Sequence, residues 1–335
     1  MGGLRPSALA RRFGGRAVGL VVTAAGLYVV APSLLALFDA WPRLGDVRPV
    51  WFGVVGGLEM ASLACLWLLL RIAMPGTGWG DIAASQLAGN AASRVIPGGA
   101  ASGGVVQARM LIQAGRPPGA VGAALSATGL LGTGMLLALP LLTVPAVIIG
   151  PPPAKELRLG LLVSLVFAVV LVALGLALLK WDRFVGLVAA AVGRSVHLVL
   201  RHADPADLAR TIVAERDQIA SAFSGRWPHA LASAAGNRML DYGALVAALV
   251  AVGAEARPSL VLVAYVGALA LAMVPITPGG LGFVETGLTT LLVLAGVSAD
   301  QALVGTLLYR LVSFWLPIPA GALAWGAWRA NAMWR

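Results

Sequence analysis

The fold of this chain is decided by two short stretches, RVIPGGA at residues 94–100 and PITPGGL at residues 275–281. Each places Pro-Gly-Gly within an otherwise apolar region. Proline has no amide hydrogen and glycine adopts dihedral angles that other residues avoid, so each triplet ends one helix before the next begins. The sequence therefore predicts two broken helices, with tips at Pro97, Gly98 and Gly99 and at Pro278, Gly279 and Gly280.

The composition around these tips is that of a membrane protein. Of 335 residues, 59% are hydrophobic and 11% are charged, and the mean hydropathy is +0.89. A soluble domain has about a quarter of its residues charged, so a soluble enzyme is excluded. The net charge of +10 comes from scattered Lys and Arg residues, which favours loops against anionic lipid over a nucleic-acid partner. With a single cysteine and three unclustered histidines, we expect no metal site and no cofactor.

The two tips belong to an internal repeat. An offset of 181 residues separates Pro97 from Pro278, and the same offset separates Gly115 from Gly296. Four consecutive apolar segments align at this offset without a gap, which a chance match of Pro-Gly-Gly does not produce. The chain then divides into repeat unit one at 50–149, a polar cytoplasmic loop with an amphipathic helix at 180–227, and repeat unit two at 231–330.

The charge distribution predicts that the two units are inverted. The apolar stretch 17–38 follows four arginines and is interpreted as a retained first span with a cytoplasmic N-terminus. Unit one then begins outside the cell and unit two begins inside. Fourteen residues of helix reach about 21 Å, against about 30 Å of hydrocarbon, so the segments beside the tips are short for a crossing. The orientation of the flanking segments would also be satisfied if the two segments beside a tip each crossed the membrane.

These observations predict an all-α polytopic membrane protein of about six to eight spans. We expect an inverted repeat with two re-entrant broken-helix hairpins, the usual architecture of secondary transporters. Backbone groups freed at the tips cannot face lipid unsatisfied. They should line a cavity, where half-helix N-termini favour an anion such as phosphate, unless the triplets are only tight turns for close packing.

Charged residues inside apolar segments are the candidate functional residues, because each costs at least about 2.5–3.5 kcal/mol when it faces lipid. They are Glu59, Arg94, Arg109, Arg238, Asp241, Glu285 and Arg310. Arg94 and Arg109 flank the first tip and are candidates for binding phosphate, although either could instead reach an interface. Glu285 follows the second tip. It either stabilises its helix or serves the substrate, by neutralising an arginine, binding an ammonium group or carrying a coupling proton.

The remaining polar candidates have structural alternatives. Arg238 and Asp241 are three residues apart on one helix and could simply pair. Together with Glu59 and Tyr309 they are assigned here to coupling or gating. Gln86 and Asn90 could hydrogen-bond a headgroup or merely join two helices.

Two longer strings resemble a known family. VPITPGGLGFVETGLTTLLVLAGVSADQALVGTLLYRLVSFWLPIPAG at residues 274–321 and ASRVIPGGAASGGVVQARML at residues 92–111 are similar to the transmembrane module of the lysylphosphatidylglycerol synthase and flippase family. The resemblance extends over about residues 15–329 and implies a lipid flippase or lipid transporter. This chain shows no soluble aminoacyl-transfer domain after the membrane part, so the resemblance does not imply synthase activity. The matching positions are Arg94, Pro97, Gly98, Gly99, Arg109, Pro278, Gly279, Gly280, Glu285 and Arg310.

The resulting hypothesis is a flippase in the plasma membrane, not an enzyme. It would move an anionic phospholipid or a polyprenyl-phosphate-linked glycolipid between leaflets, with membrane lipids as its partners. One alternative is an ion-coupled carrier of a small soluble anion. Another is a membrane-embedded transferase, which usually needs clustered aspartates or a His and Asp pair that this sequence lacks. The sequence leaves open whether the protein forms a homo-oligomer.

Overall fold

The computed structural model describes residues 47–96, 99–149, 225–272 and 280–332, with isolated positions within 42–45, 165–173 and 221–223. In these ranges the chain is helical, without strands. The expected first span at 17–38 and nearly all of the expected loop at 180–227 lie outside the described residues. The helices are α2 (Pro49–Ala73), α3 (Trp79–Val95), α4 (Ala100–Gln113), α5 (Pro118–Ile149), α9 (Trp227–Ala251), α10 (Pro258–Ala272), α11 (Phe283–Leu294), α12 (Ala299–Arg310), the π-helical turn η2 (Leu311–Trp315) and α13 (Pro317–Ala332).

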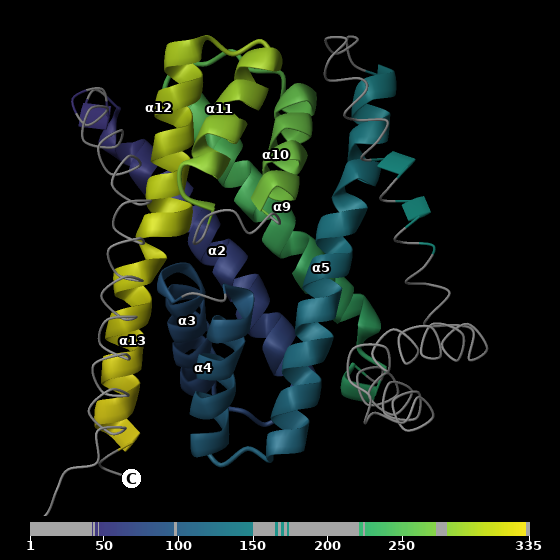
Figure 1. The fold of residues 1–335 in the computed structure, drawn as a ribbon, viewed down its shortest axis with the longest axis vertical. Coiled ribbons are helices and arrows are strands. Elements are labelled where there is room, and N and C mark those ends of the chain that lie inside the picture. Colours follow the sequence, from purple (N-terminus) through teal and green to yellow (C-terminus); the bar gives the residue numbers. More distant parts are fainter. Residues whose placement is uncertain are drawn as a thin grey trace, which may run out of the picture.

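Two helical hairpins enter the bundle from opposite ends. The hairpin of α3 and α4 occupies the lower half of the view in Figure 1, and the hairpin of α10 and α11 occupies the upper half. The last turns of α3 and α10 and the first turns of α4 and α11 lie near the middle of the molecule. The four helices have 17, 14, 15 and 12 residues. The sequence therefore correctly predicted that each Pro-Gly-Gly stretch separates two short helices.

Glycines at matching positions carry the unusual backbone angles of both hairpins. The last glycine of each triplet has a positive φ, 55° at Gly99 and 72° at Gly280. The glycines that end the second helix of each hairpin do as well, with 86° at Gly115 and 95° at Gly296. Left-handed angles strain residues that have a Cβ atom, which explains glycine at these positions. Pro97, Gly98, Pro278 and Gly279 lie outside the described residues.

The helix bounds follow the offset of 181 residues. Added to α2, α3, α4 and α5, the offset gives 230–254, 260–276, 281–294 and 299–330, close to α9, α10, α11 and the continuous α12–η2–α13 segment. In Figure 1, α5 runs from the lower end to the upper end, whereas α12–η2–α13 runs from the upper end to the lower end. An inverted repeat requires matching helices to run in opposite directions, as these do. The division into two repeat units stays a prediction.

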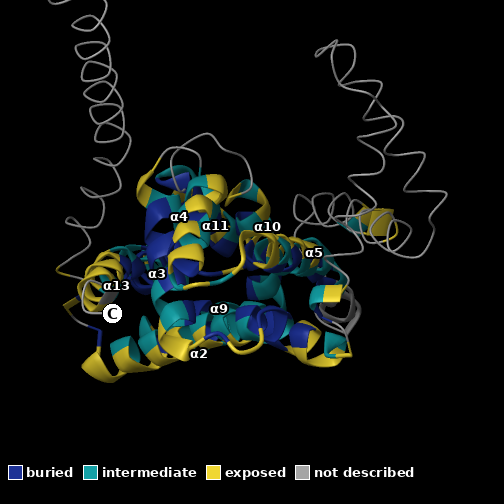
Figure 2. Ribbon diagram, turned by 90° about the horizontal axis from the view of Figure 1, so that it is seen from below, coloured by how far each residue is buried: buried dark blue, intermediate teal, exposed yellow. Residues whose placement is uncertain are grey.

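The antiparallel pair α2 and α9 crosses behind the hairpins (Figure 1). At their contact Ser62 donates to the Asn237 carbonyl at 3.0 Å, and Asn237 Nδ2 donates to Ser62 Oγ at 2.7 Å. Both residues are buried. Small and polar residues of this kind hold helices together where the surroundings are apolar. Figure 2 shows the exposed residues of α2 on the outer surface of the bundle.

Glycine also allows α13 to lie against α3. A Cβ atom placed on Gly321 would lie 2.3 Å from the Leu87 carbonyl oxygen and 2.6 Å from the Ala91 Cβ. Gly89 and Gly103 make a comparable close approach between α3 and α4, where a Cβ on Gly103 would lie 2.5 Å from the Gly89 carbonyl oxygen. The first hairpin is therefore fixed on two sides by backbone contact.

Three helical segments are long and apolar enough to cross a membrane among the described residues, namely Pro49–Ala73, Pro118–Leu141 and Ala299–Asn331. The helices of the hairpins are shorter. Basic residues gather at the lower end in Figure 1, where α2 ends, α5 begins and α13 ends. There Arg71 Nη1 donates to the Thr77 carbonyl at 2.9 Å and Arg116 donates to the Gly76 carbonyl.

Replacing Gly321 by alanine tests the backbone contact between α3 and α13. The added methyl group must displace the α3 backbone, so we expect Gly321→Ala to destabilise the purified protein by about 1–3 kcal/mol. Gly326→Ala on the same helix is the matched control, because a Cβ atom on Gly326 would meet no other atom within 4 Å. Thermal unfolding in detergent measures both. Equal midpoints for the two variants would contradict the close packing described here.

Candidate functional site

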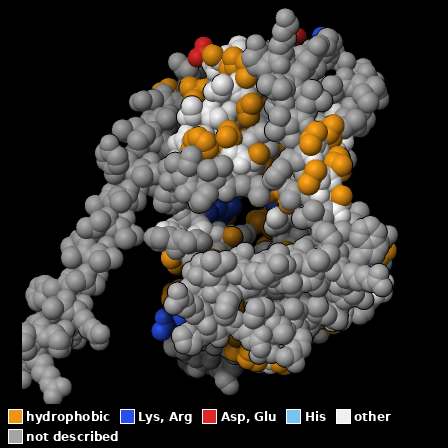
Figure 3. All heavy atoms as spheres, turned by 45° about the vertical axis from the view of Figure 1, so that its right-hand side comes forward, with side chains coloured by type: hydrophobic (Ala, Val, Ile, Leu, Met, Phe, Trp, Pro, Cys, Tyr) orange, Lys and Arg blue, Asp and Glu red, His pale blue; other side chains and the backbone are white. Residues whose placement is uncertain are grey.

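A cluster of charged side chains lies where the tip of the first hairpin meets the second hairpin and η2. Arg94 comes from the last turn of α3, Glu285 from the first turn of α11 and Arg310 from the last turn of α12. These positions are far apart in sequence, and the inverted arrangement of the helices brings them together. In the space-filling view of Figure 3, basic side-chain atoms are visible inside a hollow at about mid-height.

Arg94 donates to a backbone carbonyl whose α-helical donor position is occupied by proline. Its Nη2 donates to the Ser313 carbonyl at 2.9 Å. In an α-helix that carbonyl would accept from the amide four residues later, but residue 317 is proline and has no amide hydrogen. The turn just before it is π-helical, with the Leu316 amide donating to the Leu311 carbonyl at 2.9 Å. Such turns often occur at functional sites.

Arg310 forms an ion pair with Glu285. Its Nε lies 2.7 Å from Glu285 Oε1, and each of the two side chains is 12% exposed. The guanidinium carbon of Arg310 is also 4.2 Å from the ring centroid of Phe314, and that of Arg94 is 5.4 Å from the same centroid. One aromatic ring thus contacts two cations. Arg310 is also close enough to Arg94 to act on it electrostatically.

Some buried polar atoms of this cluster have no hydrogen-bond partner in the part of the chain that the structure describes. They are Arg94 Nη1 and Arg310 Nη2, which are donors, and Glu285 Oε2, which is an acceptor. A buried polar group without a partner costs about 1–3 kcal/mol, and more when it is charged. Available donors on two cations can bind an oxyanion, because each can donate to a different oxygen. The donors of this cluster therefore suit a phosphate group chemically.

A second cluster, centred on Asp241, adjoins the first. Tyr265 donates to Asp241 Oδ2 at 2.6 Å and Tyr309 donates to Asp241 Oδ1 at 2.7 Å. Both tyrosines are buried. Glu59 on α2 lies close enough to Asp241 to interact with it electrostatically and through its side chain. Since Tyr309 directly precedes Arg310, a shift of α12 would move both clusters together.

The structure brings together most of the predicted charged residues. Arg94, Glu285 and Arg310 form the first cluster, and Glu59, Asp241 and Tyr309 belong to the second. Arg238 lies on α9 one turn before Asp241, but no ion pair joins these two described residues, and Arg238 Nε is buried without a hydrogen bond. The simple local pair that the spacing allowed is therefore not formed.

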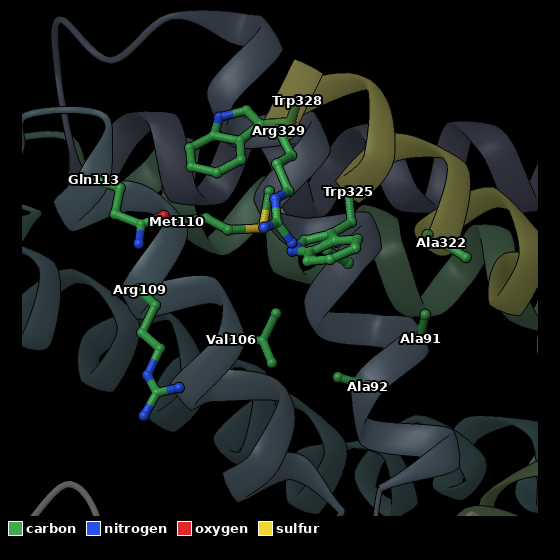
Figure 4. Close-up of a pocket in the computed structure, with 12 residues that line it drawn as sticks. Ala91, Ala92, Val106, Arg109, Met110, Gln113, Ala322, Trp325, Trp328 and Arg329 are labelled. Carbon is green, nitrogen blue, oxygen red and sulfur yellow. The ribbon is translucent and has the colours of Figure 1, made fainter. Parts of the chain in front are cut away.

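Arg109, Gln86 and Asn90 lie apart from both clusters. Gln107 on α4 donates to the Gln86 side chain on α3, so Gln86 joins the two helices of the hairpin, one of the two roles expected for it. Asn90 is partly exposed on α3. Arg109 is exposed and lines a separate cavity of about 630 Å³ between α3, α4 and α13, shown in Figure 4.

Sequence reasoning missed Tyr265, Phe314 and the Ser313 carbonyl. A signal existed for the carbonyl, because Pro317 lies four residues after Ser313 in a segment that is otherwise helical. Tyr265 lies in a strongly apolar segment, where a hydroxyl needs a partner. No feature of the sequence distinguished Phe314 from the other apolar residues around it.

Removing the Tyr309 hydroxyl tests the Asp241 cluster. Tyr309→Phe leaves one oxygen of a buried carboxylate without its donor, so we expect a loss of about 1–2 kcal/mol in unfolding free energy. Tyr242→Phe is the matched control, because the Tyr242 hydroxyl donates at 2.6 Å to the carbonyl of Pro258 in an exposed position. Unfolding of the two purified variants is compared with that of the parent protein. A larger loss in the control would contradict the role given to Asp241.

Comparison with known proteins places the chain in a family. The family model described as the lysylphosphatidylglycerol synthase TM region matches residues 7–321, which is most of the chain. A search of curated proteins found no match. The family and the long apolar helices agree that this is an all-α membrane protein with a lipid-related role. The chain therefore belongs to the lysylphosphatidylglycerol synthase transmembrane-region family.

Proposed function

We propose that the protein is a flippase that moves a lipid with an anionic headgroup between the leaflets of the plasma membrane, without changing the lipid chemically. The substrate class is a phospholipid or a polyprenyl-phosphate-linked glycolipid. The observation that carries this proposal is the pair of buried donors on Arg94 and Arg310 that have no hydrogen-bond partner among the described residues, while both guanidinium groups contact the ring of Phe314.

The chemistry of the cluster supports phosphate as the bound group. Arginine presents several donors in a planar fork that matches phosphate oxygens, and its charge persists when it is buried. Arg94 already uses one donor for Ser313 and Arg310 uses one for Glu285, which fixes the orientation of the remaining donors. A preorganised pair of this kind loses little entropy when it binds.

The position of the cluster supports translocation. With 12–17 residues, the hairpin helices reach about 18–26 Å at 1.5 Å per residue, less than about 30 Å of hydrocarbon. We therefore propose that both hairpins re-enter, one from each side, with their tips and the phosphate near the midplane. The apolar tails would remain in the bilayer through a lateral opening. The basic lower end and the N-terminus would face the cytoplasm.

In this proposal Glu285 and the Asp241 cluster couple phosphate binding to the conformation of the helices. Without substrate, Glu285 neutralises Arg310, and an arriving phosphate competes for that guanidinium. When Glu285 is released, α12 loses its ion pair with α11 through Arg310. The same helix carries Tyr309. Asp241, with Glu59 and Arg238 nearby, would then respond to whether the phosphate is bound. This gives coupling between substrate and conformation a physical route through one helix.

Transport in vesicles tests the proposal. Purified protein is placed in liposomes with headgroup-labelled phosphatidylglycerol, and the labelled lipid in the outer leaflet is measured with a membrane-impermeant quencher. We expect Arg94→Gln to slow translocation about tenfold or more, because a buried charge-assisted contact with the phosphate is lost. Arg257→Gln is the control, since Arg257 is exposed in the loop before α10.

Two results would contradict the proposal. One is equal translocation by Arg94→Gln and the parent protein. The other is an absence of translocation for phosphatidylglycerol and for a labelled polyprenyl phosphate in folded protein. Uptake of a small soluble anion by the same vesicles would then favour a carrier for such an anion.

Replacing Glu285 tests its competition with the substrate. Glu285→Gln removes the charge that neutralises Arg310, so the phosphate should bind more tightly and leave more slowly. We expect half-maximal transport at a lower lipid fraction, together with a lower maximal rate. Glu255→Gln, an exposed residue in the loop before α10, should change neither value. Weaker lipid binding by Glu285→Gln would argue against competition and for a positioning role.

A further inference from the structure

A second cavity lies between the first hairpin and α13, away from the charged cluster. Its volume is about 630 Å³, and Figure 4 shows that α3, α4 and α13 all contribute to its lining. Two arginines line it from different helices, Arg109 on α4 and Arg329 on α13. We infer that this cavity binds the phosphate of an anionic membrane lipid as an access site that precedes the central cluster. This role rests on the proposed lipid transport, whereas the binding itself does not.

The charges of the cavity favour an anion. Neither Arg109 nor Arg329 has a carboxylate partner among the described residues, and the guanidinium of Arg329 lies 5.3 Å from the ring centroid of Trp325. A smaller neighbouring cavity of about 470 Å³ has Asp81 in its lining and no arginine from the part of the chain that the structure describes. The Trp328 indole lines both cavities and donates to Asp81 Oδ1 at 3.1 Å. The carboxylate thus lines the smaller cavity. The larger cavity is lined by the two arginines and favours an anion.

The surroundings of the cavity favour a lipid over a soluble anion. Both arginines are exposed, and two tryptophans of α13 line the same cavity. Arginine and tryptophan together are typical of the membrane interface, where headgroup phosphates lie. Exposed apolar side chains are the sequence neighbours of two lining residues: Leu323, which follows Ala322, is 74% exposed, and Val105, which precedes Val106, is 52% exposed. A lipid can therefore place its phosphate in the cavity and its tails along α13 and α4.

The cavity lies beside the segment of α3 that carries Arg94. Ala91 and Ala92 line it from α3, and Arg94 follows on the same helix only about 3 Å further along the axis. Gly321 of α13 also lines the cavity and packs closely against α3. A headgroup held in the cavity would thus lie beside the part of α3 that ends at the central cluster.

Photo-crosslinking tests the site without requiring transport. The full-length protein is placed in phosphatidylcholine vesicles with a small fraction of photoactivatable phosphatidylglycerol, and labelled peptides are mapped. A photoactivatable phosphatidylcholine with the same tails is the matched probe. We expect phosphatidylglycerol to label the peptides around 106–113 and 322–329 preferentially. The double change Arg109→Gln and Arg329→Gln should lower that labelling about tenfold, as expected for lost charge-assisted phosphate contacts.

Control variants separate this inference from the proposed function. Arg116→Gln, at the same end of the molecule but outside the cavity, should leave the labelling unchanged, and so should Arg94→Gln. Equal labelling by both lipids, or labelling that persists in the double variant, would overturn the inference. Binding of inorganic phosphate that is lost in the double variant, without preferential labelling by phosphatidylglycerol, would assign the cavity to a soluble anion and would also overturn it. Labelling as expected in a protein that does not translocate lipid would reject the flippase and keep the site.

Discussion

The hydrogen bond from Arg94 to the Ser313 carbonyl is the contact on which the central arrangement depends. It joins the tip of the first hairpin to the last long helix, at the point where Pro317 occupies the α-helical donor position for that carbonyl. Within an apolar bundle such a carbonyl must be satisfied. The arginine that satisfies it is thereby fixed in position, with a donor left over. A break in a helix thus positions a cation.

The same segment brings the second cation into place. The π-helical turn carries Phe314, whose ring contacts both guanidinium groups, and Arg310 immediately precedes this turn. Two like charges in an apolar site repel each other, and Glu285 offsets part of that repulsion through its ion pair with Arg310. Within the first cluster alone, two cations therefore face one carboxylate, and Glu59 and Asp241 of the adjoining cluster also act electrostatically on Arg94. The contact to Glu285 comes from the opposite hairpin, so filling the site would affect both hairpins.

The backbone of the two hairpins is alike, but their charges are not. Glycines with positive φ recur at matched positions, Gly99 with Gly280 and Gly115 with Gly296. The positions that match Arg94, Glu285 and Arg310 at the offset of 181 are Pro275, Gly104 and Gly129, none of which is charged. A symmetric framework with one asymmetric site suits a single headgroup that is approached from either leaflet in turn.

The sequence by itself determined the membrane class, the broken helices, the pairing of segments at a fixed offset and the list of embedded charges. These follow from composition, from proline and glycine chemistry and from the cost of charge in lipid, all of which act locally. Only the tertiary structure decided which charges meet. Arg94 and Arg310 contact the same phenylalanine ring, Arg109 and Arg329 line one cavity, and Asp241 accepts hydrogen bonds from two tyrosines rather than pairing with Arg238. Partner choice depends on how helices distant in sequence cross, and no local pattern encodes those crossings.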